Sequence, residues 1–324
     1  MTLADLIERF LEVKAHRIEA TTLQGYRRIA DYYVLPRLGN VKVVKLRAVD
    51  LDHFYASLLA SGGNNGKPLS PRTVRLCHVL IRQALSQARR WGLVAMNQAD
   101  DASPPRDSHH EITPPSSADV LTLIRSGSEV DPDFGVYLRL LAATGCRRGE
   151  ALALRWRDLH LGRDTGMVTI ARSIALADGG VVEKDTKTHQ GRKVTIDAGT
   201  VKILKSHRRT WEERASLAGT VITDESFLFS SVLDGSVPWR PDVATNRFGR
   251  LCKDVGVKGV RLHDLRHYVA TSLGAEGAPI ATISSRLGHR NKATTLNIYS
   301  HSLPAQDQAA AEIIGKLLDS DGRL

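Results

Sequence analysis

The stretch ATGCRRGE, residues 143–150, constrains the fold and the chemistry of this chain more than any other. A glycine turn delivers Arg147 to the start of a helix, and Glu150 follows three residues later. Helical spacing places the two side chains on one face, where the carboxylate can orient the guanidinium. Taken alone, the pair is typical of an ordinary ion pair at the beginning of a helix. Its meaning therefore depends on the other polar segments of the chain.

Three later segments carry side chains suited to phosphate chemistry: HDLRH at 263–267, LGHR at 287–290 and TTLNIYSH at 294–301. His263 and Arg266 share a face if their segment is helical. An arginine fork binds two phosphate oxygens and an imidazole moves a proton, so this pair suits a phosphate. Gly288 indicates a helix end that holds His289 towards a cavity. Tyr299 follows in a polar setting, although a lone tyrosine is more often a packing residue.

In this order, the motifs TGCRRGE, HDLRH, LGH and IYSH resemble those of the tyrosine recombinase family, and of phage integrases in particular. The resemblance covers both halves of the chain, and TLQGYRRIADYYVLPRLGNVKV is especially similar to the family's helical core-binding domain. The implied fold is mainly α with a small antiparallel β-sheet in the second domain. It is a two-domain DNA clamp, in which a helical core-binding domain precedes a mixed α/β catalytic domain.

The resemblance implies six catalytic residues: Arg147, Lys187, His263, Arg266, His289 and Tyr299. Tyr299 would attack a DNA phosphodiester and form a 3′-phosphotyrosine, while Arg147 and Arg266 hold the nonbridging oxygens. Lys187 matches the family's lysine, which sits in a β-hairpin turn and protonates the departing 5′-oxygen. Lys184 is a nearby alternative for this role.

Two histidines and one carboxylate complete the implied site. His263 would assist proton transfer at the tyrosine, His289 would hydrogen-bond the phosphate, and Glu150 matches the family's acidic residue after the first arginine. No cofactor or metal is expected, because two arginines and a lysine take the place of the metal ions that nucleases use. The phosphotyrosine bond conserves the energy of the cleaved bond, so rejoining needs no ATP.

Periodicity and turn signals divide the chain into a helical DNA-binding domain, a proline-rich linker and a catalytic domain: 1–103, 104–117 and 118–324. The first domain should contain four helices: 2–13, 20–33, 49–60 and 71–90. Pro36 and Gly39 are expected to end the second of them. The catalytic domain should contain short strands as well as helices: 167–170, 181–183 and 193–196. An apolar-rich helix at 309–318 either packs on its own domain or serves in assembly.

Charge favours a polyanionic partner. Lys and Arg number 45 against 35 Asp and Glu, which gives a formal charge of +10. Nucleic acid is the preferred partner, ahead of a membrane surface. The expected DNA contacts are Arg72, Arg75 and Arg82, on the side of helix 71–90 away from its apolar stripe.

Cysteine usage and hydropathy exclude several other classes. The three cysteines, Cys77, Cys146 and Cys252, stand far apart, which argues against a disulfide framework or a zinc site. The sequence has no run of about 18 apolar residues, and its first residues lack the features of a signal peptide. A cytoplasmic protein with no membrane partner is therefore expected.

The function implied by the resemblance is site-specific DNA recombination, the integration or excision of a phage or mobile element. Its expected partners are double-stranded attachment-site DNA, further copies of the chain in a tetrameric synaptic complex, and DNA-bending accessory factors. The alternatives are a Xer-like chromosome-dimer resolvase, a catalytically inactive DNA-binding regulator and a type IB topoisomerase, which the short chain disfavours. Because the chain begins directly at the core-binding helices, it is either a short, Xer-like type or part of a longer protein with an arm-binding domain.

Overall fold

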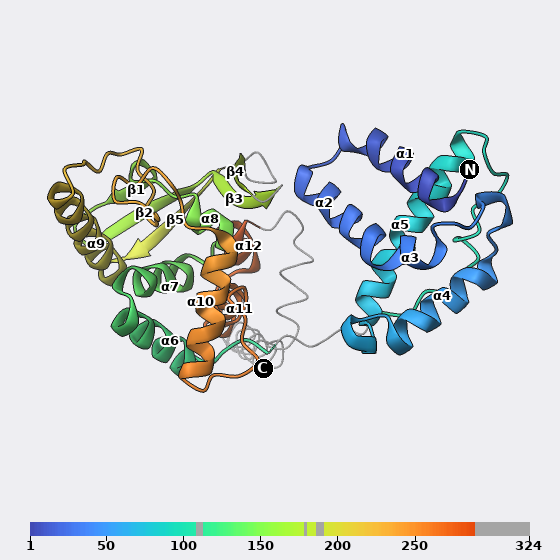
Figure 1. Cartoon of the computed structure of the whole chain (residues 1–324). Coiled ribbons are helices and arrows are strands. Elements are labelled where there is room, and N and C mark those ends of the chain that lie inside the picture. Colours follow the sequence, from blue (N-terminus) through green and yellow to red (C-terminus); the bar gives the residue numbers. More distant parts are fainter. Residues whose placement is uncertain (108–112, 178–179, 186–190, 289–324) are drawn as a thin grey trace, which may run out of the picture. The chain divides into compact units, whose positions relative to one another are not determined.

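The computed structural model describes residues 1–107, 113–177, 180–185 and 191–288 of the chain. The chain forms two compact units, one from Met1–Glu111 and one from Ile112–Leu176 with the segment that begins at Gly180. Figure 1 shows helices throughout the first unit and helices together with strands in the second. The predicted fold class, mainly α with a small antiparallel sheet in the second domain, is confirmed.

The first unit is built from helices and short helical turns: α1 (Leu3–Ala15), α2 (Ala20–Ile29), the π-helical turn η1 (Ala30–Val34), α3 (Leu35–Leu38), the 3-10 turn η2 (Val43–Lys45), α4 (Ala48–Ser61), the 3-10 turn η3 (Asn64–Gly66) and α5 (Pro71–Arg90). α1 begins at Thr2, whose hydroxyl accepts a hydrogen bond from the Asp5 amide while the Asp5 carboxylate accepts one from the Thr2 amide. α5 begins at Ser70, and Pro71 lies in its first turn, where no amide donor is needed. These helices bury their apolar faces in a common core with α4.

The second helix of this unit extends further than predicted. α2 runs directly into η1 and α3, so the helical path continues from Ala20 to Leu38. Pro36 does not end it, because the proline lies in the first turn of α3, where its missing N–H group costs no α-helical hydrogen bond. The path ends before Gly39.

The second unit combines helices with strands. Its helical segments are α6 (Ser117–Val130), α7 (Pro132–Thr144), α8 (Arg148–Leu152), the 3-10 turn η4 (Trp156–Asp158), α9 (Ala198–Leu217), α10 (Pro241–Asp254), α11 (Asp264–Ala275) and α12 (Ile280–Leu287). Its strands are β1 (Leu159–Leu161), β2 (Thr165–Ile170), β3 (Arg172–Ala177), β4 (Gly180–Asp185) and β5 (Arg192–Asp197). β2 pairs antiparallel with both β1 and β5, and β3 pairs with β4. The predicted strands lie within β2, β4 and β5, whereas β1 and β3 were not predicted.

α7 is the central helix of the second unit and fixes the place of the site at its end. It packs against α6, α9, α11 and β5. Its N-terminus is set by Asp131, whose carboxylate accepts hydrogen bonds from the amides of Asp133 and Phe134. Tyr137 is fully buried on α7 and makes an edge-to-face contact with Phe229, with ring centroids 5.1 Å apart. The C-terminus of α7 is therefore held firmly in the core.

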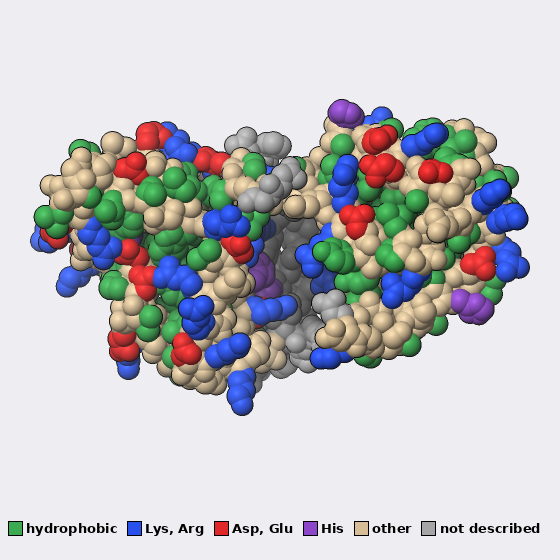
Figure 2. Space-filling view, in the orientation of Figure 1, with side chains coloured by type: hydrophobic (Ala, Val, Ile, Leu, Met, Phe, Trp, Pro, Cys, Tyr) green, Lys and Arg blue, Asp and Glu red, His purple; other side chains and the backbone are tan. Residues whose placement is uncertain are grey.

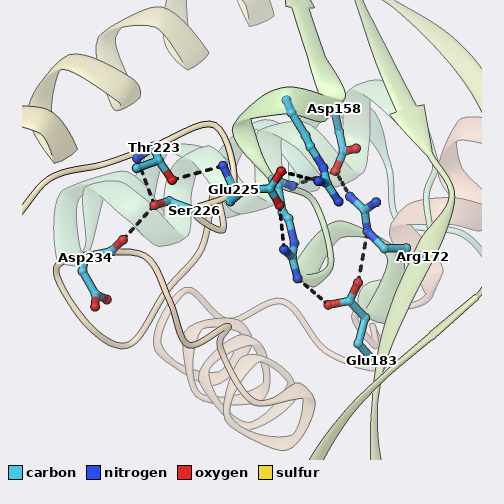
Figure 3. A network of polar contacts seen from close by, with 9 residues as sticks. Asp158, Arg172, Glu183, Thr223, Glu225, Ser226 and Asp234 are labelled. Carbon is cyan, nitrogen blue, oxygen red and sulfur yellow. Dashed lines mark hydrogen bonds and ion pairs between the residues drawn. The ribbon is translucent and has the colours of Figure 1, made fainter.

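An ion-pair network anchors the β3–β4 pair in the second unit (Figure 3). Arg155 binds Glu183 of β4 at 2.8 Å and Glu225 at 3.0 Å. Arg172 of β3 binds Asp158 at 2.5 Å and Glu183 at 3.2 Å. Glu183 thus receives one arginine from its own strand pair and one from the segment before η4, which ties β4 to the body of the unit.

The three cysteines are buried and unpaired. Cys77 lies in the core of the first unit, and Cys146 and Cys252 lie in the core of the second. Burial raises the pKa of Cys77 to about 12 and the pKa values of Cys146 and Cys252 to about 11. These thiols are therefore protonated at neutral pH and pack as small apolar groups.

The surface carries charge on both units. Figure 2 shows Lys and Arg side chains on the drawn face of each of them. Within the described ranges, no helix is both long and apolar enough to cross a membrane.

Candidate active site

The turn after α7 presents Arg147. Gly145 follows α7 with a φ of +66°, a left-handed conformation that glycine adopts without strain. A Cβ atom at this position would also lie 2.5 Å from Cδ2 of Leu287. The chain reverses here and begins α8, with Arg147 as the residue that precedes the first helical position. The glycine is thus required both by the turn and by the close approach of α12.

Glu150 is the buried carboxylate at the centre of the site. Its side chain is 3% exposed. Oε1 accepts a hydrogen bond from Arg147 Nη1 at 2.8 Å, and Oε2 accepts one from the Arg147 backbone amide at 2.8 Å. The structure therefore brings Arg147 and Glu150 into contact, while 45% of the Arg147 side chain stays exposed.

Arg192, at the start of β5, is a third member of this cluster that the sequence analysis missed. Its Nη2 donates to Glu150 Oε2 at 2.6 Å, and its Nη1 donates to Glu150 Oε1 at 3.2 Å. Its Nε donates to the backbone carbonyl of Arg286 at 3.0 Å, and the side chain is 12% exposed. No sequence pattern pointed to this contact, because 42 residues separate Arg192 from Glu150 and only the tertiary fold joins them.

The two arginines determine the ionisation of Glu150. Burial by itself would raise the pKa of this carboxyl. The hydrogen bonds and positive charge of Arg192, followed by those of Arg147, outweigh burial and lower the pKa to about 2. Glu150 is therefore a carboxylate at neutral pH and orients both guanidinium groups.

Replacing Glu150 by Gln should destabilise the protein in a pH-dependent way. The native carboxyl binds its proton only near pH 2, whereas the unfolded carboxyl binds one near its ordinary value of 4.5. The stability that ionised Glu150 contributes is therefore complete above pH 4.5 and is lost as the pH falls towards 2. The shift corresponds to about 3 kcal/mol at pH 7.

The measurement is urea unfolding of wild type and Glu150→Gln at several pH values between 7 and 3. The difference in unfolding free energy should be largest at pH 7 and should shrink below pH 4.5. Glu8→Gln serves as the control, because the Glu8 side chain is 58% exposed and its variant should follow the wild type throughout. A difference that stays constant down to pH 3 would contradict the assignment.

Arg266 lies on α11 and is nearly inaccessible, with 4% of its surface exposed. Its Nη1 donates to the backbone carbonyl of Gly145 at 2.7 Å. Among the residues that the structure describes, its buried Nη2 has no hydrogen-bond acceptor. Burial and the positive charge of Arg147 lower the pKa of Arg266 to about 9, so the guanidinium is still charged at neutral pH. A buried cationic donor without an acceptor is costly, and an anion would relieve that cost.

His263 precedes α11 and is exposed beside the arginines. Partial desolvation lowers its pKa to about 4, with further contributions from His267 and from the charges of Arg266 and Arg147. Its ring lies edge-to-face with that of His267, with centroids 5.1 Å apart. At neutral pH the imidazole of His263 is therefore uncharged, and one of its ring nitrogens can accept a hydrogen bond.

The end of α12 is fastened to the same cluster. Gly288 ends the helix with a φ of +67°, and its carbonyl accepts a hydrogen bond from Arg147 Nη2 at 3.3 Å. Arg286 Nη2 donates to the carbonyls of Ala143 at 2.6 Å and Thr195 at 3.1 Å. Guanidinium groups at a helix C-terminus satisfy its free carbonyls and oppose its dipole. The helix end predicted at Gly288 is present and lies against α7 and β5.

Three predicted catalytic residues, Lys187, His289 and Tyr299, lie outside the described residues, as does the predicted helix at 309–318. Lys187 falls between β4 and β5 in the sequence. β4 pairs with β3 and β5 pairs with β2, so the strands on either side of this position belong to different sheets. Lys184, the alternative, lies on β4.

The predicted DNA contacts lie together on α5 in the first unit. Arg72, Arg75 and Arg82 are all exposed. Arg82 Nε forms an ion pair with Asp100 Oδ1 at 2.6 Å, which partly neutralises its charge. Within the part of the chain that the structure describes, Arg72 and Arg75 therefore present the less compensated charges of the three.

Comparison with known proteins defines the class of enzyme. The chain belongs to the phage integrase family: residues 132–306 match that family, and residues 2–59 match the phage integrase N-terminal SAM-like domain. The resemblance inferred from the four motifs is thereby confirmed, and the chain is a tyrosine recombinase.

The relatives are distant in sequence and differ in how much of this chain they cover. A tyrosine recombinase XerC-like protein of Caldanaerobacter subterraneus is 26% identical over 98% of this chain and 83% of the relative. The ICEBs1 integrase of Bacillus subtilis is 29% identical over 57% of this chain and 49% of the relative. Among solved structures, the Tn1549 transposon integrase in complex with transposon right end DNA matches with a TM-score of 0.79, at 19% identity over 96% of this chain and all of the other. A lambda integrase dimer bound to a core site matches with a TM-score of 0.67, at 14% identity over 92% of this chain and 77% of the other.

Proposed function

We propose that this recombinase cleaves and rejoins double-stranded DNA at the attachment sites of a phage or other mobile element, and so integrates or excises that element. The observation that carries the proposal is Arg266, a buried cation whose Nη2 has no acceptor among the described residues, beside the half-exposed Arg147. Two guanidinium groups of this kind suit the nonbridging oxygens of a phosphodiester. The names of relatives, an ICEBs1 integrase and a Tn1549 transposon integrase, support mobile-element DNA as the substrate.

The proposed cleavage step uses Tyr299 as the nucleophile. Its phenolic oxygen bonds to phosphorus, and the bond from phosphorus to the 5′-oxygen breaks, which leaves a 3′-phosphotyrosine. His263 takes up the phenolic proton, and Lys187, or alternatively Lys184, donates a proton to the departing 5′-oxygen. Rejoining reverses these steps at a new 5′-hydroxyl without ATP.

Four charged or polar groups act on the phosphate itself. Arg147 and Arg266 stabilise the charge that develops on the nonbridging oxygens, and His289 donates a hydrogen bond to one of them. Glu150 holds Arg147 in place through its two hydrogen bonds to that residue. No step in this scheme assigns a role to a metal ion or an organic cofactor.

The test is covalent capture. The full chain is incubated with a pool of random 40-base-pair duplexes that each carry a nick, after enrichment of the pool for binding. Denaturing gels should then show protein–DNA adducts linked to a 3′-phosphate, and sequencing of the captured DNA would define the cleavage site. Adducts on a 5′-phosphate, or none after enrichment, would refute the proposal.

The proposed organisation is a DNA-binding domain at 1–103, a linker at 104–117 and a catalytic domain at 118–324, which grip one duplex between them. Each described unit has an apolar core of its own, which supports independent folding. Arg72, Arg75 and Arg82 are the proposed phosphate contacts of the first domain.

We also propose that the enzyme acts in the cytoplasm, as a tetramer on two DNA sites and with DNA-bending factors. The solved lambda integrase tetramer bound to a Holliday junction supports the tetramer.

Residues 118–324 alone should bind DNA more weakly than the full chain and with a shallower dependence on salt. Each phosphate contact that is lost lowers the slope of log affinity against log salt by about 0.9. Residues 1–103 should bind DNA without cutting it, because every proposed catalytic residue lies after the linker. The measurement is fluorescence anisotropy of a labelled duplex over a series of salt concentrations, made with residues 1–103, with residues 118–324 and with the full chain. Equal slopes for residues 118–324 and the full chain would rule out the two-domain grip.

A second candidate function is Xer-like resolution of chromosome dimers. The XerC-like relative, which aligns with 98% of this chain, favours it. The captured sites distinguish the two functions, because an integrase joins two unlike sites whereas a dimer resolvase joins two copies of one site. Recombination assays with pairs of captured duplexes would therefore separate them.

A further inference from the structure

The site contains more arginine than its phosphate chemistry uses. Arg147 and Arg192 both bind Glu150, and together they fill each carboxylate oxygen with two hydrogen bonds. All three donor groups of Arg192, its Nε, Nη1 and Nη2, are directed to protein acceptors. Three of its five N–H donors therefore bind protein acceptors within the described residues, and only 12% of its side chain is exposed to a DNA phosphate.

Arg147, unlike Arg192, is exposed enough to bind a DNA phosphate. Its side chain is 45% exposed, and its Nη2 makes a single long hydrogen bond of 3.3 Å to the Gly288 carbonyl. Two cations and one buried carboxylate leave a net charge of +1. Because Arg192 is the buried partner of Glu150, this remaining charge resides on the exposed Arg147.

We propose that Arg192 is a positioning residue that neutralises Glu150 and so keeps the charge of Arg147 available to the DNA phosphate. The inference rests on the proposed function, in which Arg147 binds a nonbridging oxygen. Without Arg192, Arg147 is the nearest cation to a buried carboxylate and is held by it. The pair is then neutral overall and attracts a phosphate less strongly.

The second contact of Arg192 extends this role to α12. Its Nε bond to the Arg286 carbonyl fixes the last turn of that helix. A Cβ atom at Gly288 would lie 2.9 Å from Arg192 Nη1, so the glycine allows the guanidinium to pass close to the helix end. The Arg192 side chain therefore has two effects: it neutralises the carboxylate beside Arg147, and it fixes the end of α12, after which the sequence continues to His289.

The experiment compares Arg192→Met with Arg192→Lys in the full chain. The probe is the nicked duplex recovered by covalent capture, used at saturating concentration in single-turnover assays. Arg192→Met should lower the rate of adduct formation by about 100-fold, the scale expected when one preorganised charge is lost. Its dissociation constant for DNA should stay within about threefold, since most phosphate contacts lie elsewhere. Arg192→Lys should be at least tenfold faster than Arg192→Met, because charge is restored even though the fork is not.

Arg139→Met is the matched control. Arg139 is another partly buried arginine of the second unit, and its Nη2 is 3.0 Å from the Asp197 carboxylate, but it contacts neither Glu150 nor Arg147 among the described residues. The Arg139→Met variant should unfold at a lower temperature than wild type, and its rate of adduct formation should stay within about threefold of wild type. An equal loss of rate in Arg139→Met and Arg192→Met would mean that Arg192 acts only through stability and would overturn the inference.

A double-mutant cycle tests whether Arg192 acts through Arg147. If it does, Arg147→Ala with Arg192→Met should be no more than about threefold slower than Arg147→Ala alone. Losses that multiply would show that Arg192 acts independently of Arg147 and would overturn the inference. A rate for Arg192→Lys as low as that for Arg192→Met would also overturn it.

A measurement without DNA separates this inference from the proposed function. Calorimetric titration of the full chain with inorganic phosphate should give binding about tenfold weaker in Arg192→Met and unchanged in Arg139→Met. If wild type forms no adduct on any duplex, the proposed function fails, while this loss of phosphate binding still supports the role of Arg192. Unchanged phosphate binding in Arg192→Met, or a wild type that neither binds phosphate nor cuts DNA, overturns the inference.

Discussion

The Tyr299→Phe variant is expected to form no covalent adduct with DNA and to bind DNA almost as tightly as wild type. The substitution removes one hydroxyl group, which is the only proposed nucleophile, and leaves the charges that govern DNA affinity unchanged. No other side chain of the proposed site can form a phosphodiester of comparable stability. The loss should therefore be complete within the detection limit of a denaturing gel.

Two measurements on the same preparation check this result. Adduct formation on the captured nicked duplex is followed over hours, and DNA affinity is measured by anisotropy. Tyr268→Phe is the control, because Tyr268 belongs to the same unit and its hydroxyl makes only a 3.3 Å hydrogen bond to Ser117 among the described residues. That variant should cut at the wild-type rate. Adducts at the wild-type level in Tyr299→Phe would show that another residue is the nucleophile.

Arg266→Ala should lower the rate of cleavage by about a thousandfold, the upper range for removal of one preorganised donor to a transition state. The guanidinium is fixed by its bond to the Gly145 carbonyl, and its Nη2 has no acceptor in the described part of the chain. The Arg266 guanidinium can therefore bind the phosphate without a change in its own position. Arg266→Lys should recover little of the rate, because an ammonium cannot bind Gly145 and a phosphate oxygen with the same planar fork.

Single-turnover rates and unfolding midpoints should be measured together for these variants. Because Arg266→Ala removes the hydrogen bond to the Gly145 carbonyl and leaves a cavity, the unfolding midpoint shows whether a slow variant is still folded at the assay temperature. Arg261→Ala is the control on the same segment, since Arg261 is 73% exposed and paired with Asp264. An Arg266→Lys variant with full activity would contradict the role proposed for the planar fork of Arg266, which binds the Gly145 carbonyl and a phosphate oxygen together.

The helices that begin with a clear cap were predictable from sequence. α5 begins at Pro71, directly after the capping residue Ser70, and carries its apolar residues at helical spacing, so both its start and its buried face are encoded locally. The continuation of α2 through Pro36 was not predictable, because it depends on a π-helical turn that shifts the backbone register. β1 was missed because three residues give no alternation.

The contacts of the candidate site were likewise predictable only where they are local in the sequence. Arg147 and Glu150 are three residues apart at the start of α8, so their contact is local in the sequence and could be predicted, although Arg147 precedes the helix and is not itself helical. Arg192 of β5 reaches Glu150 of α8 only through the tertiary fold, and no local pattern encodes that contact. Arg286 likewise binds the Ala143 carbonyl across 143 residues of sequence. Contacts of this kind are properties of the tertiary fold.

The reactivity of the buried cysteines can be used to measure the unfolding of each unit. The thiolate is the form that attacks alkylating reagents, and burial, which raises the pKa values to about 11 to 12, suppresses that form in all three thiols. Cys77 belongs to the first unit, and Cys146 and Cys252 belong to the second. Mass spectrometry of alkylated peptides would therefore time the unfolding of each unit separately within the intact, unlabelled enzyme. Cysteine residues introduced elsewhere on the surface could be labelled selectively under native conditions, with no need to remove the natural ones.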